Sequence, residues 1–282
     1  MIKSDLHTHS YYSDGTISPK ELVIRARKVG IKILALTDHN SVKGVGEAIK
    51  EGKRLGVSII PGVEIMCKEG EILGYFIDYK NPGLRKKLAR CAYPSNEKVK
   101  RKIVALQKKG LNISHAIFKK IFPHSTENYI KAHLKMYLMS LGFNPEEVEE
   151  LIRIEVQEPR EKKLTLETAI RLIKKYGGVP VLAHPWLDKK IFLKEKNIRA
   201  CLAAGLGGIE FDNGDRTHWG RDRMAVNKIK KYAKKYNLIL TRGSDHHALP
   251  WHKGKGHLLG NTFCDEKVVE QLGNQAKALK HK

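Results

Sequence analysis

Cysteine and acidic residues are scarce in this chain of 282 residues. Its four cysteines lie far apart and form no C-x-x-C pair, so we expect neither a disulfide framework nor a thiolate metal site. No apolar run approaches the about 18 residues that span a bilayer. No apolar segment typical of a signal peptide follows Met1. The sequence therefore predicts a cytoplasmic protein that does not enter membranes.

The shortage of acidic side chains leaves a strongly basic chain. Lys and Arg number 53 against 30 Asp and Glu, which gives a formal net charge of +23. Such a charge attracts anions and favours nucleotides, phosphorylated metabolites or nucleic acid as partners. A lysine-rich solubilising surface would produce the same excess. The sequence indicates no obligate protein partner.

Strand and helix patterns alternate over residues 1–80 and again over residues 164–282. The first helix begins at "ISPKEL", with Ser18 as its N-cap and Pro19 at its first position. This alternation implies parallel β units. Residues 81–163 contain lysine-rich helical stretches and no convincing strand. We therefore predict an α/β core domain over 1–80 and 164–282, interrupted by a helical insertion or cap over 81–163.

The predicted core strands end in polar clusters. These read "DLHTH", "TDH", "GVE", "AHP", "EFDN" and "GSDHH". The carboxyl ends of parallel strands share one face, where active sites are built. Seven side chains are therefore expected to converge there: His7, His9, His39, Glu64, His184, Asp245 and His247.

Imidazole and carboxylate side chains are the usual protein ligands of zinc, iron and manganese. A structural zinc uses four ligands, whereas these clusters supply more, which suits two or three catalytic ions with Glu64 as the bridge between them. Two ions about 3.5–4 Å apart can hold a bridging hydroxide and neutralise the oxygens of a phosphoryl transfer. Together with the basic charge, this favours phosphoester hydrolysis over peptide or amide hydrolysis.

The segments "DLHTHSYYSDG", "ALTDHN", "GVEI", "AHP" and "GSDHH" resemble, in order and spacing, the motifs of the polymerase and histidinol phosphatase (PHP) superfamily. The resemblance is closest to nucleotide phosphoesterases with a helical insertion. It implies a distorted (β/α)7 TIM-like barrel and a metal-dependent phosphoesterase.

The resemblance also implies a distribution of ligands. One ion would be held by His7, His9, Glu64 and Asp245, and a second by Asp14, His39 and His247. His184 would join Glu64 on a third. Asp38 would orient the ligands beside it, the usual role of a carboxylate next to a metal-binding histidine. Catalysis is thus expected at Asp14, Asp38, His39 and His247, with the identity of the general acid left open.

Glu71 departs from the family pattern, which has a histidine in this strand. A carboxylate can also bind manganese or iron, so a third ion would survive with altered preference, or be weak or absent. The sequence accordingly predicts two or three divalent ions (Mn, Fe or Zn). An ordinary turn residue in "KEGEIL" is the alternative for Glu71.

Basic residues outside the strand ends are candidates for substrate binding. Lys131 and His133 match the family's Arg-Pro-His-Ile segment, although His133 could instead pack on its helix. His218 and Arg221 lie in the basic loop "GDRTHWGRDR", where a solvated loop is the alternative, and Arg242 precedes "GSDHH".

The favoured function is hydrolysis of nucleotide phosphate esters, such as a 3′,5′-nucleoside bisphosphate, or of the 5′ end of short RNA. A phosphatase or cyclic phosphodiesterase acting on small metabolites, such as histidinol phosphate, would use the same metal site. A non-catalytic nucleic-acid-binding protein is the alternative from another class.

Overall fold

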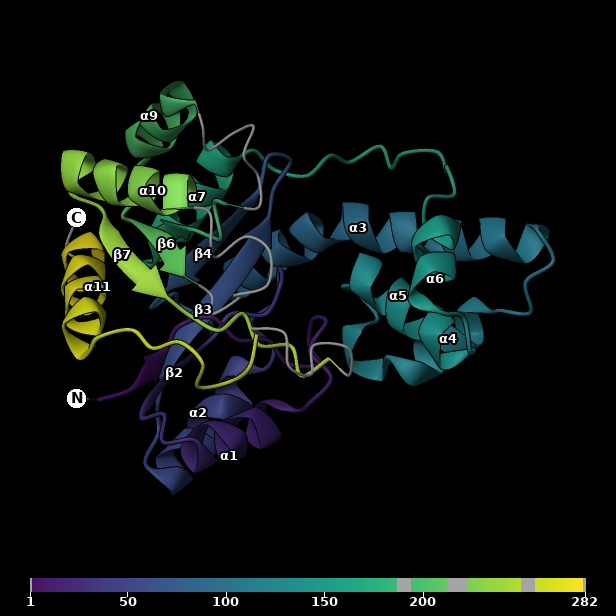
Figure 1. Cartoon of the computed structure of the whole chain (residues 1–282), viewed down its shortest axis with the longest axis horizontal. Helices are drawn as coiled ribbons and strands as arrows, with labels where there is room; N and C mark the ends of the chain where they lie inside the picture. Colours follow the sequence, from purple (N-terminus) through teal and green to yellow (C-terminus); the bar gives the residue numbers. More distant parts are fainter. Residues whose placement is uncertain (1, 187–193, 213–222, 250–256, 281–282) are drawn as a thin grey trace.

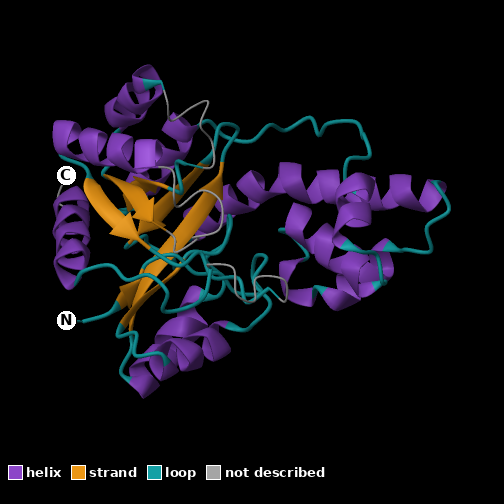
Figure 2. Ribbon diagram, in the orientation of Figure 1, coloured by secondary structure: helices purple, strands orange, loops and turns teal. Residues whose placement is uncertain are grey.

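The computed structural model describes residues 2–186, 194–212, 223–249 and 257–280. Its core is a seven-stranded sheet, ordered from β1 to β7 as in the sequence, that forms a nearly closed barrel (Figure 2). The strands are β1 (Ser4–Asp5), β2 (Ile33–Leu36), β3 (Ser58–Met66), β4 (Glu71–Tyr75), β5 (Val179–Leu182), β6 (Gly208–Asp212) and β7 (Ile239–Arg242). The segments that follow β1 and β7 also meet, because His9 N–H donates to the His246 carbonyl at 2.9 Å.

β4 runs against the direction of the other strands. β1, β2 and β3 pair in parallel, as do β5, β6 and β7, in agreement with the predicted parallel units. β4 is antiparallel to both β3 and β5, because the turn at residues 67–70 is too short for a helical crossover. Its first residue, Glu71, therefore lies at the end of the barrel where the parallel strands finish.

Helices cover the outside of the sheet (Figure 1). They are α1 (Pro19–Lys28), α2 (Val45–Leu55), α7 (Leu166–Lys175), α9 (Glu195–Ala204), α10 (Arg223–Tyr236) and α11 (Glu266–Lys280). The predicted start of α1 is confirmed, since Ser18 Oγ accepts a hydrogen bond from the Glu21 N–H at 3.0 Å. Between helices and strands, side chains such as Leu22, Leu34 and Ile170 are fully buried. Burial of each such side chain contributes about 1.5–3 kcal/mol.

The insertion consists of helices and has its own apolar core. It comprises α3 (Pro82–Lys108), α4 (His115–Ile121), the 3₁₀ turn η1 (Pro123–Ser125), α5 (Lys131–Ser140) and α6 (Pro145–Leu151). Ile103, Phe118 and Tyr137 are fully buried in this second core. Earlier in α3, Leu84 and Leu88 pack into the barrel core. One continuous helix therefore belongs to both parts and joins them.

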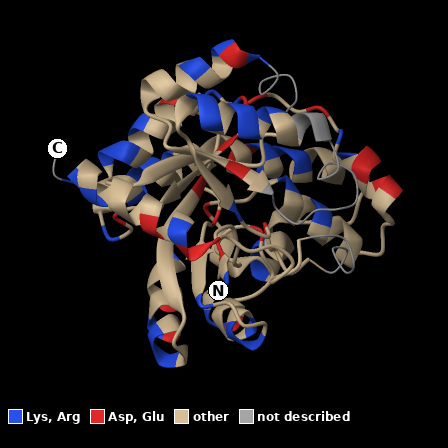
Figure 3. Cartoon of the chain, turned by 60° about the vertical axis from the view of Figure 1, so that its left-hand side comes forward, with Lys and Arg blue, Asp and Glu red and all other residues tan. Residues whose placement is uncertain are grey.

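No helix among the described residues is long and apolar enough to cross a membrane. Lys and Arg occur on most of the helices around the barrel and in the insertion, with fewer Asp and Glu between them (Figure 3). The basic excess is thus spread widely over the outer surface.

Candidate metal centre

The candidate ligands gather at the end of the barrel that faces the insertion. His7 and His9 follow β1 and, two residues apart, turn their imidazoles to the same side, with ring centroids 5.1 Å apart. His39 forms an isolated bridge with Glu64 of β3. The structure brings together nine predicted ligands: His7, His9, Asp14, His39, Glu64, Glu71, His184, Asp245 and His247.

The first group consists of His7, His9, Glu64 and Asp245. The Nε2 atoms of His7 and His9 are 3.1 Å apart and lie 3.1 and 3.2 Å from Glu64 Oε2. The same two nitrogens are 3.3 and 3.4 Å from Asp245 Oδ1. Donors about 2.0–2.2 Å from a tetrahedral ion lie about 3.3–3.6 Å from one another. These four atoms therefore have nearly the spacing of one coordination shell.

The second group consists of His9, Asp14, His39 and His247. Asp14 Oδ1 lies 3.1 Å from His247 Nε2 and 3.7 Å from His39 Nε2. His9 Nδ1 is 3.8 Å from the same oxygen. The imidazole of His9 consequently stands between the first two groups.

The third group consists of His39, Glu64 and Glu71, with His184 beside it. Glu64 Oε1 is 2.9 Å from His184 Nε2, and Glu71 Oε2 is 3.2 Å from that nitrogen. The Glu71 carboxylate thus faces the centre and does not behave as an ordinary turn residue. Since Glu64 Oε2 faces the first group, its two oxygens lie between the first and third groups, the position of a bridging ligand.

The arrangement of these donor atoms suits divalent cations, because hydrogen bonds among the side chains do not satisfy all of them. Asp14 Oδ1 and His39 Nδ1 are buried, and neither has a hydrogen-bond partner among the described residues. Leaving buried polar atoms unpaired costs free energy. A cation between the imidazoles and carboxylates would satisfy both atoms, and this mixture of nitrogen and oxygen donors suits Mn, Fe or Zn.

The charges around Glu64 favour its ionised form. Burial alone would raise the pKa of Glu64, but the charges of His7 and His39 hold it well below its usual range. Burial would likewise lower the pKa of His9, whereas hydrogen bonds with Asp245 and Glu64 raise it to about 10. Because a metal ligand must be deprotonated, metal binding would release protons from these imidazoles.

Glu210 is a functional candidate that the sequence analysis did not single out. This fully buried residue of β6 lies with Oε1 3.0 Å from His7 Nδ1, and its Oε2 accepts the His184 N–H at 2.8 Å. Protonation of His7 Nδ1 toward this carboxylate would direct the lone pair of Nε2 at the first group. Its position in the strand end "EFDN" could have identified Glu210, because side-chain alternation along the strand places it on the inward face of the barrel.

Two further carboxylates hold the ligand-bearing loops. Asp38 accepts hydrogen bonds from the Ser10 N–H and from the hydroxyls of Ser10 and Ser13, each at 2.7 Å. It thereby holds the loop that carries Asp14. Asp5, which the sequence analysis did not select, accepts the Ser244 N–H at 2.8 Å, and burial raises its pKa to about 6.

The backbone is unusually tight at the last ligand segment. Asp245 has φ 54°, in the left-handed region. Just before it, a Cβ on Gly243 would lie 2.3 Å from the Cβ of His7. Only glycine allows these two segments to approach so closely. Such strain is typical of functional sites.

The insertion is bonded directly to the loops of the metal centre. Ser125 Oγ donates to the carbonyls of Tyr11 and Ser13 at 2.6 and 3.0 Å. Asn128 Nδ2 donates to the His39 carbonyl. His133 is buried: its Nδ1 accepts the Ile130 N–H at 3.1 Å, and its Nε2 donates to the Ser13 carbonyl at 2.6 Å.

His133 therefore differs from the substrate contact that the sequence suggested. Both its ring nitrogens are used by backbone groups, so its observed role is to fasten α5 to the Asp14 loop. Lys131 is exposed at the start of α5, and its Nζ lies 3.8 Å from Glu149 of α6.

Arg242 also differs from expectation. Its side chain is exposed, and its guanidinium lies over the Phe211 ring, 4.8 Å from the centroid. Because Glu210 points into the barrel, its neighbour Phe211 faces the helices. Arg242 is consequently on the outer side of the sheet, away from the phosphate position expected for it. The other two predicted substrate contacts, His218 and Arg221, lie outside the described residues.

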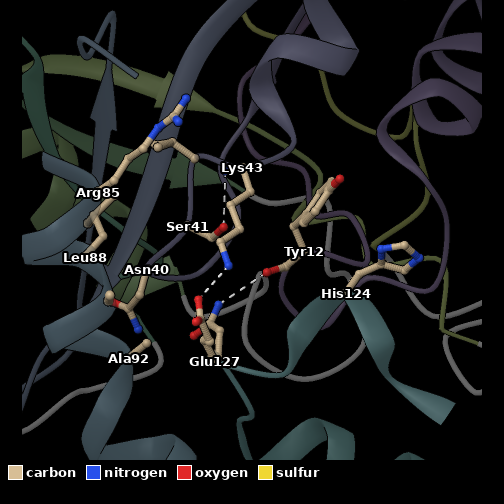
Figure 4. Close-up of a pocket in the computed structure, with 12 residues that line it drawn as sticks. Tyr12, Asn40, Ser41, Lys43, Arg85, Leu88, Ala92, His124 and Glu127 are labelled. Carbon is tan, nitrogen blue, oxygen red and sulfur yellow. Dashed lines mark hydrogen bonds and ion pairs between the residues drawn. The ribbon is translucent and has the colours of Figure 1, made fainter. Parts of the chain in front are cut away.

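A small cavity of about 120 Å³ lies where the insertion meets the barrel loops. Tyr12, Lys43 and Arg85 border it, and the Lys43–Glu127 ion pair (2.8 Å) crosses from barrel to insertion (Figure 4). Tyr11 stacks on His124 nearby, with ring centroids 4.0 Å apart. The ion pair is exposed, so its contribution to stability is small.

Known proteins with similar sequences act on phosphate esters. The chain is 29% identical over 265 residues to a 5′-3′ exoribonuclease of Haemophilus influenzae, covering 87% of this chain and 90% of the relative. It is 29% identical to a 3′,5′-nucleoside bisphosphate phosphatase of Chromobacterium violaceum, with 88% of each chain covered. It is also 28% identical to a phosphoribosyl 1,2-cyclic phosphate 1,2-diphosphodiesterase of Eggerthella lenta, covering 86% and 93%.

Solved structures show the same fold. A crystal structure from Bifidobacterium adolescentis superposes with a TM-score of 0.83 at 22% identity, over 97% of this chain and 96% of the other. An amidohydrolase from Chromobacterium violaceum with bound sulfate and no metal superposes with a TM-score of 0.77 at 26% identity, over the same shares. The family model described as the PHP domain matches residues 5–176, which is more than half of the chain. The chain therefore belongs to the PHP domain family.

Proposed function

We propose that this protein is a metal-dependent phosphoester hydrolase acting on nucleotides or on the 5′ ends of short RNA. The observation that carries the proposal is the position of Glu64, whose two carboxylate oxygens face different groups of imidazole and carboxylate donors. A structural metal site needs only one closed shell, whereas overlapping groups are typical of hydrolytic centres with more than one ion.

The ligands would be distributed over two or three divalent ions, Mn, Fe or Zn. The first would be held by His7, His9, Glu64 and Asp245, and the second by Asp14, His39 and His247. Glu71 and His184 would complete a third site with Glu64. Bound ions would polarise the phosphoryl oxygens and make water more acidic.

The protein's own contribution is to fix the donors before substrate arrives. Glu210 orients His7 through its contact with Nδ1. His247 Nδ1 lies 2.8 Å from the Asp245 carbonyl and would donate its proton to it, so that His247 Nε2 faces Asp14. His257 also approaches the centre, with Nδ1 3.4 Å from Asp245 Oδ2. The insertion holds the Asp14 loop from the other side through Ser125 and His133.

Nucleotide substrates are supported by two independent observations. Relatives that match nearly the whole chain are named for 5′-3′ exoribonuclease and nucleoside bisphosphate phosphatase activity, and the net charge of +23 attracts polyanions. A cyclic phosphodiester is the second candidate, because the diphosphodiesterase relative covers a similar share of the chain at 28% identity.

The test is phosphate release from a panel of esters in the presence of manganese. The panel contains a 3′,5′-nucleoside bisphosphate, AMP, histidinol phosphate, a cyclic nucleotide with a phosphatase added to free its phosphate, and a 5′-phosphorylated RNA trimer. We expect turnover of a nucleotide or RNA substrate that is lost in His9→Ala and Asp245→Ala. A metal-loaded protein that hydrolyses none of them, yet binds RNA, would contradict the proposal and favour a binding role.

A further inference from the structure

A groove of about 530 Å³ lies between the barrel mouth and the insertion, apart from the metal ligands. This volume is within the range of about 300–1,000 Å³ of small-ligand sites. Its walls come from the end of β3, the middle of α3, the start of α5 and the segment that returns from α6 to the barrel. That returning segment runs beside α3 (Figure 1), where Arg101 donates to the carbonyls of Gln157 and Glu158 at 2.7 and 3.1 Å.

The groove is strongly basic. Six lysines line it against two glutamates: Lys68, Lys98, Lys102, Lys131, Lys162 and Lys163, with Glu158 and Glu161. Lys98 pairs with Glu158. In the described part of the chain, Lys68, Lys162 and Lys163 have no ion-pair partner. Burial and then the charges of Lys98 and Lys131 lower the pKa of Lys102. Repulsion among these cations would be relieved by an anionic ligand.

Apolar residues also line the groove: Met66, Pro94, Val99, Leu134 and Pro159. Val99 and Leu134 belong to the core of the insertion and are almost fully buried, so packed side chains hold this part of the lining. A lining of apolar residues and lysines suits a single-stranded nucleic acid, whose bases contact apolar surface while its phosphates meet the cations.

The groove begins beside the metal centre. Met66 is paired across the strands with Glu71, and directly opposed residues share one face of a sheet. On the same strand, Glu64 and Met66 also point to one face. At its other wall, Leu134 follows His133, which is bonded to the Ser13 carbonyl next to Asp14. A chain whose end sits at the metal centre could therefore continue into the groove.

We propose that this groove binds the sugar-phosphate backbone of a single-stranded RNA whose 5′ end lies at the metal centre. The inference rests on the proposed function and adds where an RNA substrate would lie beyond its 5′ end. A continuing phosphodiester chain also explains why six lysines line a groove apart from the candidate ligands, since a mononucleotide would leave most of them unused.

The test compares two triple variants of the manganese-loaded protein. Lys68→Ala/Lys162→Ala/Lys163→Ala changes the groove, and Lys28→Ala/Lys50→Ala/Lys53→Ala removes the same charge from exposed positions of α1 and α2. We measure kcat/KM for a 5′-phosphorylated RNA hexamer and for a nucleoside bisphosphate, and hexamer binding by fluorescence anisotropy over a range of salt concentrations.

The groove variant should lower the ratio of hexamer to mononucleotide kcat/KM by about tenfold, through an increase in KM for the hexamer. It should also reduce the slope of log affinity against log salt by about 2, because three lysines are removed and each single-strand phosphate contact contributes about 0.7. The control variant should leave both near wild type. An equal decrease of the kcat/KM ratio and of hexamer affinity in the two variants, or no decrease in either, would overturn the proposal that RNA binds in the groove. A second result would also overturn the proposal: an acidic peptide of equal charge displaces the hexamer from the wild-type protein but not from the groove variant.

Failure of the proposed function is a separate result. A protein that hydrolyses neither substrate refutes the hydrolase, whereas the anisotropy measurement still tests the groove. Hydrolysis of both substrates with unchanged ratios in the groove variant refutes only the groove.

Discussion

At the scale of single residues, Glu210 controls the orientation of His7. Glu210→Gln removes the charge that fixes the His7 tautomer while keeping the side chain's size. Loss of such partners typically costs about 10–100-fold in metal affinity or activity. We expect a decrease of that size in kcat at limiting manganese, partly restored by excess metal. Glu195→Gln, on the exposed face of α9, is the control; equal activity in both variants would show that Glu210 does not position His7.

Binding of a third ion is expected to depend on Glu71. Its carboxylate lies 3.2 Å from His184 Nε2 and contributes to the third group only. Glu71→Ala should therefore lower the manganese content by about one ion per chain, because two donors remain for that site. Glu71→His should restore it. Metal analysis after gel filtration measures this directly, and an unchanged content in Glu71→Ala would remove the third site from the account.

Most candidate ligands could be predicted from the sequence because they follow core strands, whose carboxyl ends topology alone brings to one face. Asp5 and Glu210 stand within the strand ends "DLHTH" and "EFDN", but they were missed because they hold neighbouring segments and belong to none of the three donor groups. Arg242 was misplaced for a different reason. Its nearness in sequence to "GSDHH" suggested nearness in space, but strand alternation directs its side chain to the opposite face.

At the scale of elements, the strand–helix alternation predicted the parallel β units, and the resemblance to the PHP superfamily implied the barrel. Neither indicated how the barrel joins the helical segment. The reversal of β4 depends on the short turn at residues 67–70. The length of α3 depends on two separate cores that bury its two halves. Neither follows from local periodicity, because both are set by packing against parts of the chain far away in sequence.

The contact between α5 and the Asp14 loop should make stability depend on pH. Burial lowers the pKa of His133 from 6.5 to about 4. The unfolded chain therefore binds a proton between these values that the folded chain does not, so stability is lost as the pH falls from about 6.5 to about 4. The loss is on the order of 3 kcal/mol.

Urea unfolding of metal-free protein across this pH range measures the effect. His133→Gln, which cannot take up the proton, should lose less stability than wild type over the same interval. Phe122, which contacts the His133 ring, provides a control in Phe122→Leu, expected to lower stability equally at each pH. Parallel pH curves for wild type and His133→Gln would contradict the placement of His133.

At the scale of the whole molecule, the scarce cysteines are structural side chains. All four are free and buried, and burial raises the pKa of Cys91 and Cys264 to about 11 and of Cys201 to about 12. Thiolate, the reactive form, is therefore rare at neutral pH. We expect very slow labelling by a disulfide reagent in the native protein and labelling of four thiols per chain in denaturant. Rapid native labelling would contradict this packing.

The composition favours anionic partners, but only the fold indicates where such a partner would lie. Most lysines are spread over the helices (Figure 3), whereas those of the groove border a cavity next to the metal centre. Position relative to the metal centre, more than net charge, therefore distinguishes a binding surface from a solubilising one.

The most direct test of the central claim is the metal content and turnover of Glu64→Gln, measured on the same preparation. Glu64 faces both the first and the third group. The account predicts loss of bound manganese together with a decrease in phosphate release of about a hundredfold or more, in a protein that remains folded. Glu64→Gln with full metal content and wild-type turnover would show that the strand ends do not form the hydrolytic centre.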